Sequence, residues 1–201
     1  MKHFVYFSSS ASTSPGFRTE NLMKAGRMDI AIHVLINTFF ISRQIREDVK
    51  LHLIFYGMPD PPKHIEITLK QNSGIEKEED SLDVSKKDVA GLIKRALRGY
   101  KKEEKREVLP GIFVEKKSLL KVIEELSKKN DIFILDKKGE DLRKAKISEN
   151  CVFVLGDHDG LPKKELKRLR KKFLSTSVGP KIYFASQIIS ILNNELDRRN
   201  I

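Results

Sequence analysis

The chain is poor in the residues that hold small extracellular proteins together. Its 201 residues include one cysteine, Cys151, and no tryptophan. A single cysteine excludes an intrachain disulfide and a zinc cluster built on several thiolates, and it is typical of proteins from a reducing compartment. We therefore expect a cytoplasmic protein whose fold depends on an ordinary hydrophobic core, for which this length is ample.

Long apolar runs are also missing. No stretch approaches the ~20 consecutive apolar residues that a membrane-spanning helix needs. The N-terminal MKHFVYFSSS is too short an apolar segment for a secretory signal and reads as a first strand. No long linker and no internal repeat divides the chain. These absences predict a single domain over residues 1–201 that makes no contact with a membrane.

The common phosphate-binding and hydrolase motifs are absent as well. The sequence contains no GxxxxGK[ST], no GxGxxG and no GxSxG. It therefore lacks the signatures of P-loop enzymes, of dinucleotide-binding folds and of α/β-hydrolases.

Positive charge is what the chain has in excess. Lysine and arginine number 39 against 28 aspartate and glutamate, which gives a formal net charge of +11. Such a surface attracts polyanions, and RNA suits it better than a membrane. A helix predicted at residues 162–172 is especially basic, and we assign Lys167, Arg168 and Lys171 to an RNA-binding surface, together with Arg46 outside the helix. The alternative for such a helix is a face that is merely solvated.

Short apolar strands alternate with helices along the chain. Strands are predicted at residues 3–8, 49–56, 64–70, 131–136 and 151–155, with a turn and short strand at 109–114 and a loop at 72–85. Helices are predicted at residues 27–43, 85–102, 118–129, 162–172 and 182–197. Because most strands are continuous apolar runs, we predict an α/β fold whose mostly parallel sheet is covered by helices on both faces.

Three loops at the carboxyl ends of predicted strands carry small or acidic residues. They follow Leu135, Leu155 and the short segment before Ser177, and ligands of open α/β sheets bind at this edge. The middle loop contains Asp157, His158 and Asp159, which disfavour a phosphate, and adjacent residues seldom converge on one metal ion. An adenosine held by backbone groups, with carboxylates near a cationic sulfonium, suits these residue types better. A turn that only ends a strand remains the alternative.

Several short motifs occur in a fixed order over nearly the whole chain. They are Gly26-Arg-Met-Asp29, Ile45-Arg-Glu-Asp-Val49, GMPDPP, Pro110-Gly-Ile112, Gly139-Glu-Asp141, Gly156-Asp-His158 and Asn194-Glu-Leu-Asp197. In this order they resemble the archaeal TrmY family of tRNA pseudouridine N1-methyltransferases. This family is a branch of the SPOUT superfamily of RNA methyltransferases, which the C-terminal part of the chain also resembles.

The resemblance implies a SPOUT fold in which residues about 130–201 form a trefoil knot around S-adenosylmethionine. It places this cofactor at a set of loop and helix residues: Leu135, Gly156, Asp157, Ser177, Val178, Gly179 and Ile188. It also implies a homodimer. The closing helix predicted at residues 182–197 is apolar on most of its circumference, so a second subunit or the protein's own core must cover it.

The resemblance further implies methylation of N1 of pseudouridine 54 in the T-loop of tRNA. That nitrogen carries a proton, which some acceptor must remove. We place Arg27 and Asp29 at the RNA base and Asp157 beside the cofactor as candidate catalytic residues, and we expect no metal. Two other functions stay open at this point: N1-methylation of a pseudouridine in ribosomal RNA, and RNA binding without catalysis.

Overall fold

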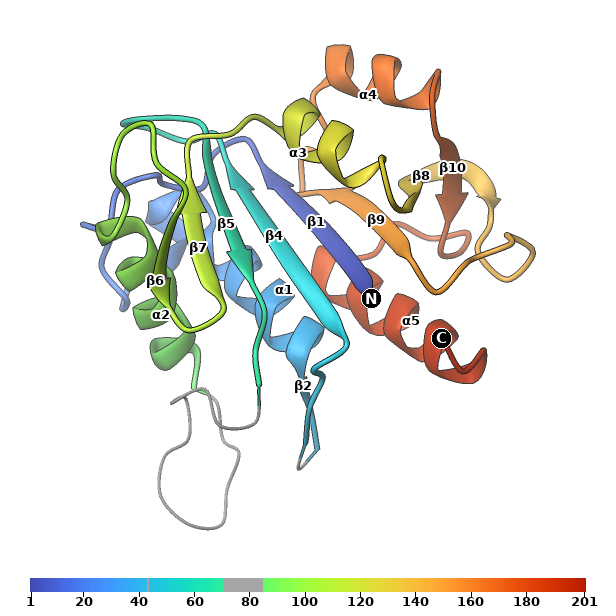
Figure 1. Cartoon of the computed structure of the whole chain (residues 1–201), viewed down its shortest axis with the longest axis horizontal. Helices are drawn as coiled ribbons and strands as arrows, with labels where there is room; N and C mark the ends of the chain where they lie inside the picture. The colour runs from blue at the N-terminus through green and yellow to red at the C-terminus, as the bar shows by residue number, and fades with distance from the viewer. Residues whose placement is uncertain (43, 71–84) are drawn as a thin grey trace.

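An eight-stranded sheet forms the centre of the protein (Figure 1). The computed structural model describes residues 1–42, 44–70 and 85–201. The strand order is β10-β8-β9-β1-β4-β5-β7-β6. The strands are β1 (Lys2–Ser8), β4 (Val49–Phe55), β5 (Lys63–Ile67), β6 (Arg106–Leu109), β7 (Ile112–Glu115), β8 (Asp131–Asp141), β9 (Cys151–Gly156) and β10 (Leu174–Ser177). A separate small hairpin pairs β2 (Phe40–Ile41) with β3 (Gln44–Ile45).

Five neighbouring strands of the sheet, β10, β8, β9, β1 and β4, run parallel to one another. The predicted mostly parallel sheet is therefore confirmed for this half. The other three strands, β5, β7 and β6, pair antiparallel. Short connections explain the change of direction, because the turn at Pro110–Gly111 can join only antiparallel neighbours, whereas parallel neighbours need a long crossover.

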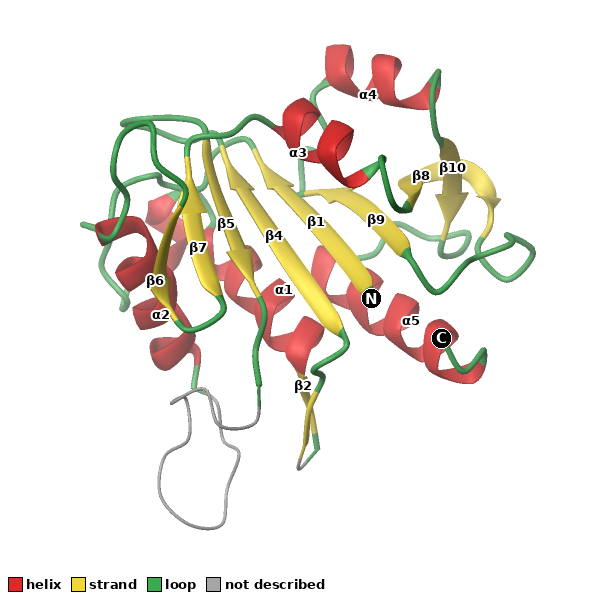
Figure 2. Cartoon of the chain, viewed as in Figure 1, coloured by secondary structure: helices red, strands yellow, loops and turns green. Residues whose placement is uncertain are grey.

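Helices cover both faces of the sheet (Figure 2). On one face lie α1 (Met28–Phe39), α2 (Lys86–Arg98) and α5 (Ala185–Arg198), with the 3-10 turn η1 (Leu22–Ala25) leading into α1. On the other lie α3 (Leu119–Leu126) and α4 (Lys163–Arg170). Side chains of β1 alternate between the two apolar clusters, so that each face buries one half of a strand that is apolar nearly throughout. No helix among the described residues is long and apolar enough to cross a membrane.

Three predicted helices differ from the structure at their ends. The helix predicted at residues 27–43 ends at Phe39, where the chain enters the β2–β3 hairpin. The helix predicted at 85–102 ends at Arg98, directly before Gly99. The closing helix begins at Ala185 rather than at Ile182, and the side chains of Ile182 and Phe184 are exposed ahead of it. Apolar residues continue past Phe39 and precede Ala185, which concealed these two boundaries in the sequence, whereas α2 ends at a glycine.

The strands differ from the predictions in two places. The strand predicted at residues 131–136 continues as β8 to Asp141, where its later part pairs with β10 across an irregularity in register. The edge strand β6 was absent from the predicted elements, because its charged sequence does not alternate clearly. The loop predicted at residues 72–85 lies outside the described residues except for Ser85, whose hydroxyl caps α2 by accepting the Asp88 N–H at 3.2 Å.

Three buried histidines form a hydrogen-bonded chain across the sheet. His3 Nδ1 lies 3.0 Å from His52 Nε2, and His52 Nδ1 lies 2.9 Å from His64 Nε2. The chain ends where His64 Nδ1 lies 3.1 Å from Glu115 Oε1. Since a carboxylate can only accept, His64 carries its proton on Nδ1, and the same tautomer follows for the two neutral rings behind it.

Burial keeps His3 and His52 in this chain neutral. It lowers the pKa of His3 to about 4, and it holds the pKa of His52 well below the ordinary value, helped by the neighbouring histidines. Charged groups around the chain are Lys50, Glu66, Lys105 and Lys117, which pair with one another or with Glu115. A proton added to the chain would therefore place a charge inside the sheet without a free partner.

We predict that the free energy of unfolding falls as the pH drops from about 7 to 5. Below about pH 6.5 the unfolded chain protonates both His3 and His52, whereas the folded chain does not, so by pH 5 folding loses about 2 kcal/mol through His3 and a further amount through His52. The carboxylates whose pKa values are lowered, such as Glu115 at about 2, lose their contribution only at lower pH. Urea denaturation at the two pH values measures the difference.

Two variants separate the histidine chain from other titrating groups. His52→Leu should lower stability at pH 7 by about 1–3 kcal/mol, because it leaves two buried ring nitrogens unpaired, and it should also reduce the pH dependence. His33→Gln, in the partly exposed part of α1, should reduce the pH dependence less, because burial also lowers the pKa of His33 but its ring is not enclosed in the sheet. Equal stability of the unmodified protein at pH 7 and pH 5 would contradict the interpretation.

Candidate cofactor and acceptor site

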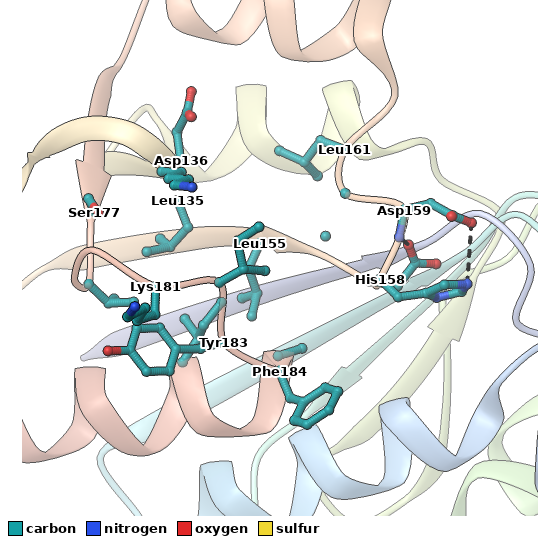
Figure 3. A pocket seen from close by; sticks show the side chains of 18 of the residues that line it. Leu135, Asp136, Leu155, His158, Asp159, Leu161, Ser177, Lys181, Tyr183 and Phe184 are labelled. Carbon is teal, nitrogen blue, oxygen red and sulfur yellow. Dashed lines mark hydrogen bonds and ion pairs between the residues drawn. The ribbon is translucent and has the colours of Figure 1, made fainter.

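The middle of β8 and the loops that follow β9 and β10 meet around one cavity of about 510 Å³ (Figure 3), so the residues after Leu135, expected in a loop, lie within the strand. This volume is in the range of pockets that enclose small organic ligands. Because β8, β9 and β10 are parallel neighbours on one side of β1, their carboxyl ends lie at the same edge of the sheet. The start of α5 closes the cavity from below in this view, and α4 lies above it.

All seven residues that the sequence assigned to the cofactor line this cavity. They are Leu135, Gly156, Asp157, Ser177, Val178, Gly179 and Ile188. Apolar side chains from α4 and the ends of β8 and β9 form much of the wall, while the polar groups come mostly from the loops. Such a cavity, with an apolar interior and backbone groups at its rim, suits a nucleoside better than a bare anion.

Gly156, which the sequence assigned to the cofactor, also has a structural role in the turn after β9. Asp157 and Gly160 form an isolated bridge, which folds the loop after β9 back on itself. A β-carbon on Gly156 would lie 2.2 Å from the Gly160 backbone. Glycine is thus required by the turn itself, whereas a β-carbon on Gly160 would meet no atom within 4 Å. In this turn the backbones of Gly156 and Gly160 lie in close contact, and the free space lies beside Gly160.

Asp157 ties this turn to the loop that follows β1. Its Oδ2 accepts the Ser8 hydroxyl at 2.8 Å and the Ser9 N–H at 3.0 Å, and its Oδ1 accepts the Asp159 N–H at 2.9 Å. The side chain is buried. Both carboxylate oxygens are therefore already engaged within the protein, in a geometry that fixes the cavity wall.

Arg27 and Asp29 form a forked ion pair at the start of α1. Arg27 Nε and Nη2 donate to the two carboxylate oxygens of Asp29 at 3.1 and 3.0 Å, and this hydrogen bonding lowers the pKa of Asp29. Arg27 has φ 60°, in the left-handed region that is strained for residues with a β-carbon. Gly26 before it is also left-handed, and a β-carbon there would lie 1.7 Å from the Ser10 carbonyl oxygen. Strained residues of this kind concentrate at functional sites.

The buried phenol of Tyr6 on β1 responds to all three candidate catalytic residues. Burial raises the pKa of Tyr6, and the Asp157 carboxylate raises it further, whereas a hydrogen bond with Ser8 lowers it. Asp29 and Arg27 have smaller and opposing effects.

The predicted RNA-binding residues divide into two groups. Lys167, Arg168 and Lys171 are exposed on or next to α4, as expected for a binding surface. Arg46 instead binds Asp197 on α5 through two hydrogen bonds of 2.7 and 2.5 Å and is only 12% exposed. Arg46 therefore holds the end of α5 in place, and its donors are used within the protein.

Several lining residues were not identified from the sequence. Asp136 lies at the cavity and pairs with Arg170, which ties α4 to the site. His158 and Asp159 lie at the side of the cavity away from Ser177, with Nε2 and Oδ2 3.5 Å apart (Figure 3). Lys181, Ile182, Tyr183 and Phe184 also line it. Pro180 could have indicated that these four residues form a loop, because a helix that follows a proline can begin several residues after it.

Among the described residues, two clusters of histidine and carboxylate side chains could be read as metal sites, but their ligand atoms already have partners within the protein. Asp157, His158 and Asp159 offer ligand atoms within 4.8 Å of one another. However, both oxygens of Asp157 already accept hydrogen bonds, which leaves the turn without the free donor set that a cation prefers. The same holds for His52, His64 and Glu66, whose ligand atoms bind one another or lysines.

Known proteins match the chain over its whole length. Residues 1–201 match the family model described as "Putative SAM-dependent RNA methyltransferase". The chain is 35% identical over 205 residues to a Vibrio parahaemolyticus protein named "Putative pseudouridine methyltransferase", with 99% of each chain covered. It is 33% identical over 208 residues to the tRNA (pseudouridine(54)-N(1))-methyltransferase of Pyrococcus abyssi, with 100% of each chain covered.

The fold also has a counterpart among solved structures. The crystal structure of Archaeoglobus fulgidus Nep1, determined with S-adenosylhomocysteine bound, superimposes with a TM-score of 0.59 at 14% identity, over 99% of this chain and 98% of that one. At this identity the match supports the fold only. The end-to-end agreement with the family model, in a chain whose three loops converge on one ligand-sized cavity, shows that this protein belongs to the SAM-dependent RNA methyltransferase family.

Proposed function

We propose that the protein transfers a methyl group from S-adenosylmethionine to N1 of pseudouridine 54 in the T-loop of tRNA. The observation that carries this proposal is the single cavity in which all seven residues assigned to the cofactor lie together. The full-length similarity to the Pyrococcus abyssi enzyme of that name supports the choice of nucleoside and RNA.

The cavity wall fits the nucleoside part of this cofactor. Leu135, Val178 and Ile188 would enclose the adenine, and the backbone of the loops after β8 and β10 would hold its polar edge. The Ser177 hydroxyl donates to the Gly179 carbonyl at 3.0 Å, which fixes the third loop in its present shape. When bound, the cofactor supplies a methyl group on a positively charged sulfur.

The acceptor base would enter from the side of Arg27 and Asp29. The Arg27 side chain is 37% exposed and is held by Asp29, so it can hydrogen-bond a uracil carbonyl or a phosphate without losing its orientation. Asp157 contributes by fixing the turn after β9 to the loop after β1, which sets the distance between the two binding sites.

A basic surface next to the cavity would hold the tRNA backbone. It consists of exposed residues of α4 and the turn after it: Lys163, Lys164, Lys167, Arg168, Lys171 and Lys172. The ion pair between Arg170 and Asp136 fixes this helix directly to the cofactor cavity. The net charge of +11 supports binding to a polyanion. We leave Arg46 out of this surface because Asp197 occupies its guanidinium.

The assembly that we propose is a homodimer of single-domain subunits. Ile182 and Phe184 are 85% and 75% exposed beside the start of α5, and exposed apolar residues of this size favour burial against another chain. Ser190 on the outer side of α5 bonds Asn37 of α1, so these two helices present one continuous surface. We further propose that residues about 130–201 form the trefoil knot typical of the SPOUT fold. A tRNA substrate would place the enzyme in the cytoplasm.

The first prediction from the proposed function concerns the cavity. Gly160→Asn should weaken binding of S-adenosylhomocysteine about tenfold or more while changing the melting temperature little. Asparagine tolerates the left-handed backbone of Gly160, and its side chain would extend into the open space beside that glycine. Gly156→Val should lower both affinity and melting temperature, because it displaces the Gly160 backbone. Calorimetry that finds unchanged affinity in Gly160→Asn would remove this turn from the binding site.

The second prediction concerns the substrate. The enzyme should methylate tRNA with pseudouridine at position 54 and leave the same tRNA unmodified when uridine stands there. N1 of uridine is the glycosidic nitrogen and has no proton to lose, whereas the carbon glycoside of pseudouridine leaves N1 free. Mass spectrometry of nuclease-digested product locates the methyl group. A methylated ribose, a methylated carbon, or a preference for ribosomal RNA fragments would contradict the proposal.

The third prediction separates the function of Arg27 from its structural cost. Arg27→Ala and Arg27→Gly both remove the guanidinium, so both should lower the single-turnover rate by about 10²-fold with unchanged cofactor affinity. Arg27→Gly should in addition be more stable than Arg27→Ala by about 1 kcal/mol, because glycine adopts the left-handed backbone without strain. Rates near that of the unmodified enzyme in both variants would limit Arg27 to a structural role.

A further inference from the structure

His158 and Asp159 form a side-chain pair at the edge of the cavity. His158 Nε2 lies 3.5 Å from Asp159 Oδ2, and both residues line the cavity. Figure 3 shows the pair on the side opposite Ser177 and Lys181, with Phe184 below it. The His158 side chain is 45% exposed, so solvent or a substrate can reach it.

We propose that His158 accepts the proton of the methylated nitrogen and that Asp159 is its positioning residue. This inference rests on the proposed function, since it assigns the proton acceptor for the same reaction. Imidazole is the side chain whose ordinary titration lies nearest to neutral pH, which makes it the commonest general base.

The orientation of the pair determines which ring nitrogen is available. A proton on Nε2 faces the Asp159 carboxylate, and the neutral ring then carries its lone pair on Nδ1. Asp159 is itself placed by its N–H, which donates to Asp157 Oδ1 at 2.9 Å. Because Ser8 and Ser9 hold Asp157, the histidine is fixed indirectly to the end of β1, close to the strands that form the cavity.

The proton transfer balances the methyl transfer. As the bond between N1 and the methyl carbon forms, the electron pair of the broken carbon–sulfur bond stays on sulfur. The N1–H bond breaks, its electron pair remains in the pyrimidine ring, and the proton moves to Nδ1 of His158. The positive charge of the sulfonium is thereby replaced by that of an imidazolium, which the Asp159 carboxylate stabilises.

The other acidic groups near the cavity are poorly suited to this step. Both oxygens of Asp157 accept hydrogen bonds from the protein. Asp29 is held by both donors of the Arg27 fork, and that pairing lowers the pKa of its carboxyl group, which makes it a weaker base. Asp136 pairs with Arg170 on α4. Among the described residues that line the cavity, the His158 ring keeps a nitrogen that can both receive a hydrogen bond and take up a proton.

The charged groups that line the cavity or lie next to it come from four segments. Asp157 and Asp159 lie on the same turn as His158, Asp136 and Lys137 lie on β8, and Lys181 belongs to the loop before α5, across the cavity from His158 (Figure 3). The Arg27–Asp29 pair lies at the start of α1, next to the lining residue Ile30. Asp159 is the carboxylate in direct contact with the ring, so it is the group that orients it.

The rate test uses the full-length enzyme, tRNA with pseudouridine at position 54, and saturating cofactor. The single-turnover rate of the unmodified enzyme should rise with pH through an inflection, because only the neutral ring can take up a proton. His158→Gln should lower the rate at pH 7.5 by about 10²-fold and abolish that inflection. Asp159→Asn should lower the rate less than His158→Gln does and keep the inflection, because it removes only the group that positions the ring.

A binding test without cofactor provides a readout that does not depend on turnover. The unmodified protein should bind a T-loop RNA with pseudouridine about fivefold more tightly than the same RNA with uridine, because the N1–H donates to Nδ1. His158→Gln should keep this preference, since its amide oxygen still accepts a hydrogen bond. His158→Phe should lose it. Circular dichroism and S-adenosylhomocysteine affinity serve as controls for folding.

The outcomes separate this inference from the proposed function. An unmodified enzyme that does not methylate the pseudouridine-bearing tRNA would refute the function itself. An active enzyme whose His158→Gln variant keeps its rate within threefold, or keeps the pH inflection, would overturn only the role of His158. Loss of activity on treatment with EDTA would also overturn it, because a cation bound at the turn would occupy the ring nitrogen.

Discussion

The buried carboxylate of Asp157 is the contact on which the geometry of the site depends. It receives hydrogen bonds from Ser8 and Ser9 at the end of β1 and from Asp159 in its own turn. These bonds join a segment near the N-terminus to one about 150 residues later. They set the separation between the loop after β1 and the turn after β9. In the proposed function this separation matters, because methyl transfer depends on in-line placement of the two reactants.

Close backbone approach provides the second constraint. The serine-rich loop after β1 passes so near two other segments that a β-carbon on Gly26 would lie 1.7 Å, and one on Gly57 2.2 Å, from the Ser10 carbonyl oxygen. The same crowding leaves Arg27 in a left-handed conformation, which the neighbouring contacts must stabilise. Two segments from different parts of the chain are thus fixed against one loop. This explains why glycine and a strained arginine occur together at the start of α1.

The sheet divides into a half that builds the site and a half that supports it. The parallel strands place their carboxyl ends at one edge, where loops can converge on a ligand. The histidine chain crosses from the parallel strands into the antiparallel ones. It runs from His3 on β1 and His52 on β4 to His64 on β5 and Glu115 on β7, and so connects four strands by side-chain hydrogen bonds. The neutral rings of His3 and His52 link stability to pH, whereas the cavity lies at the other side of β1.

The sequence by itself determined the alternation of strands and helices, the buried strands and the excess of positive charge, which follow from local patterns and from composition. The resemblance of its motifs to a known family supplied seven residues that line one cavity, and their contact with a cofactor stays a prediction. Only the tertiary structure decided the roles of individual polar groups. Arg46 faces Asp197, and Asp157 faces Ser8. Hydrogen bonds between side chains distant in sequence have no local pattern, because their partners become neighbours only when the sheet and its loops pack together.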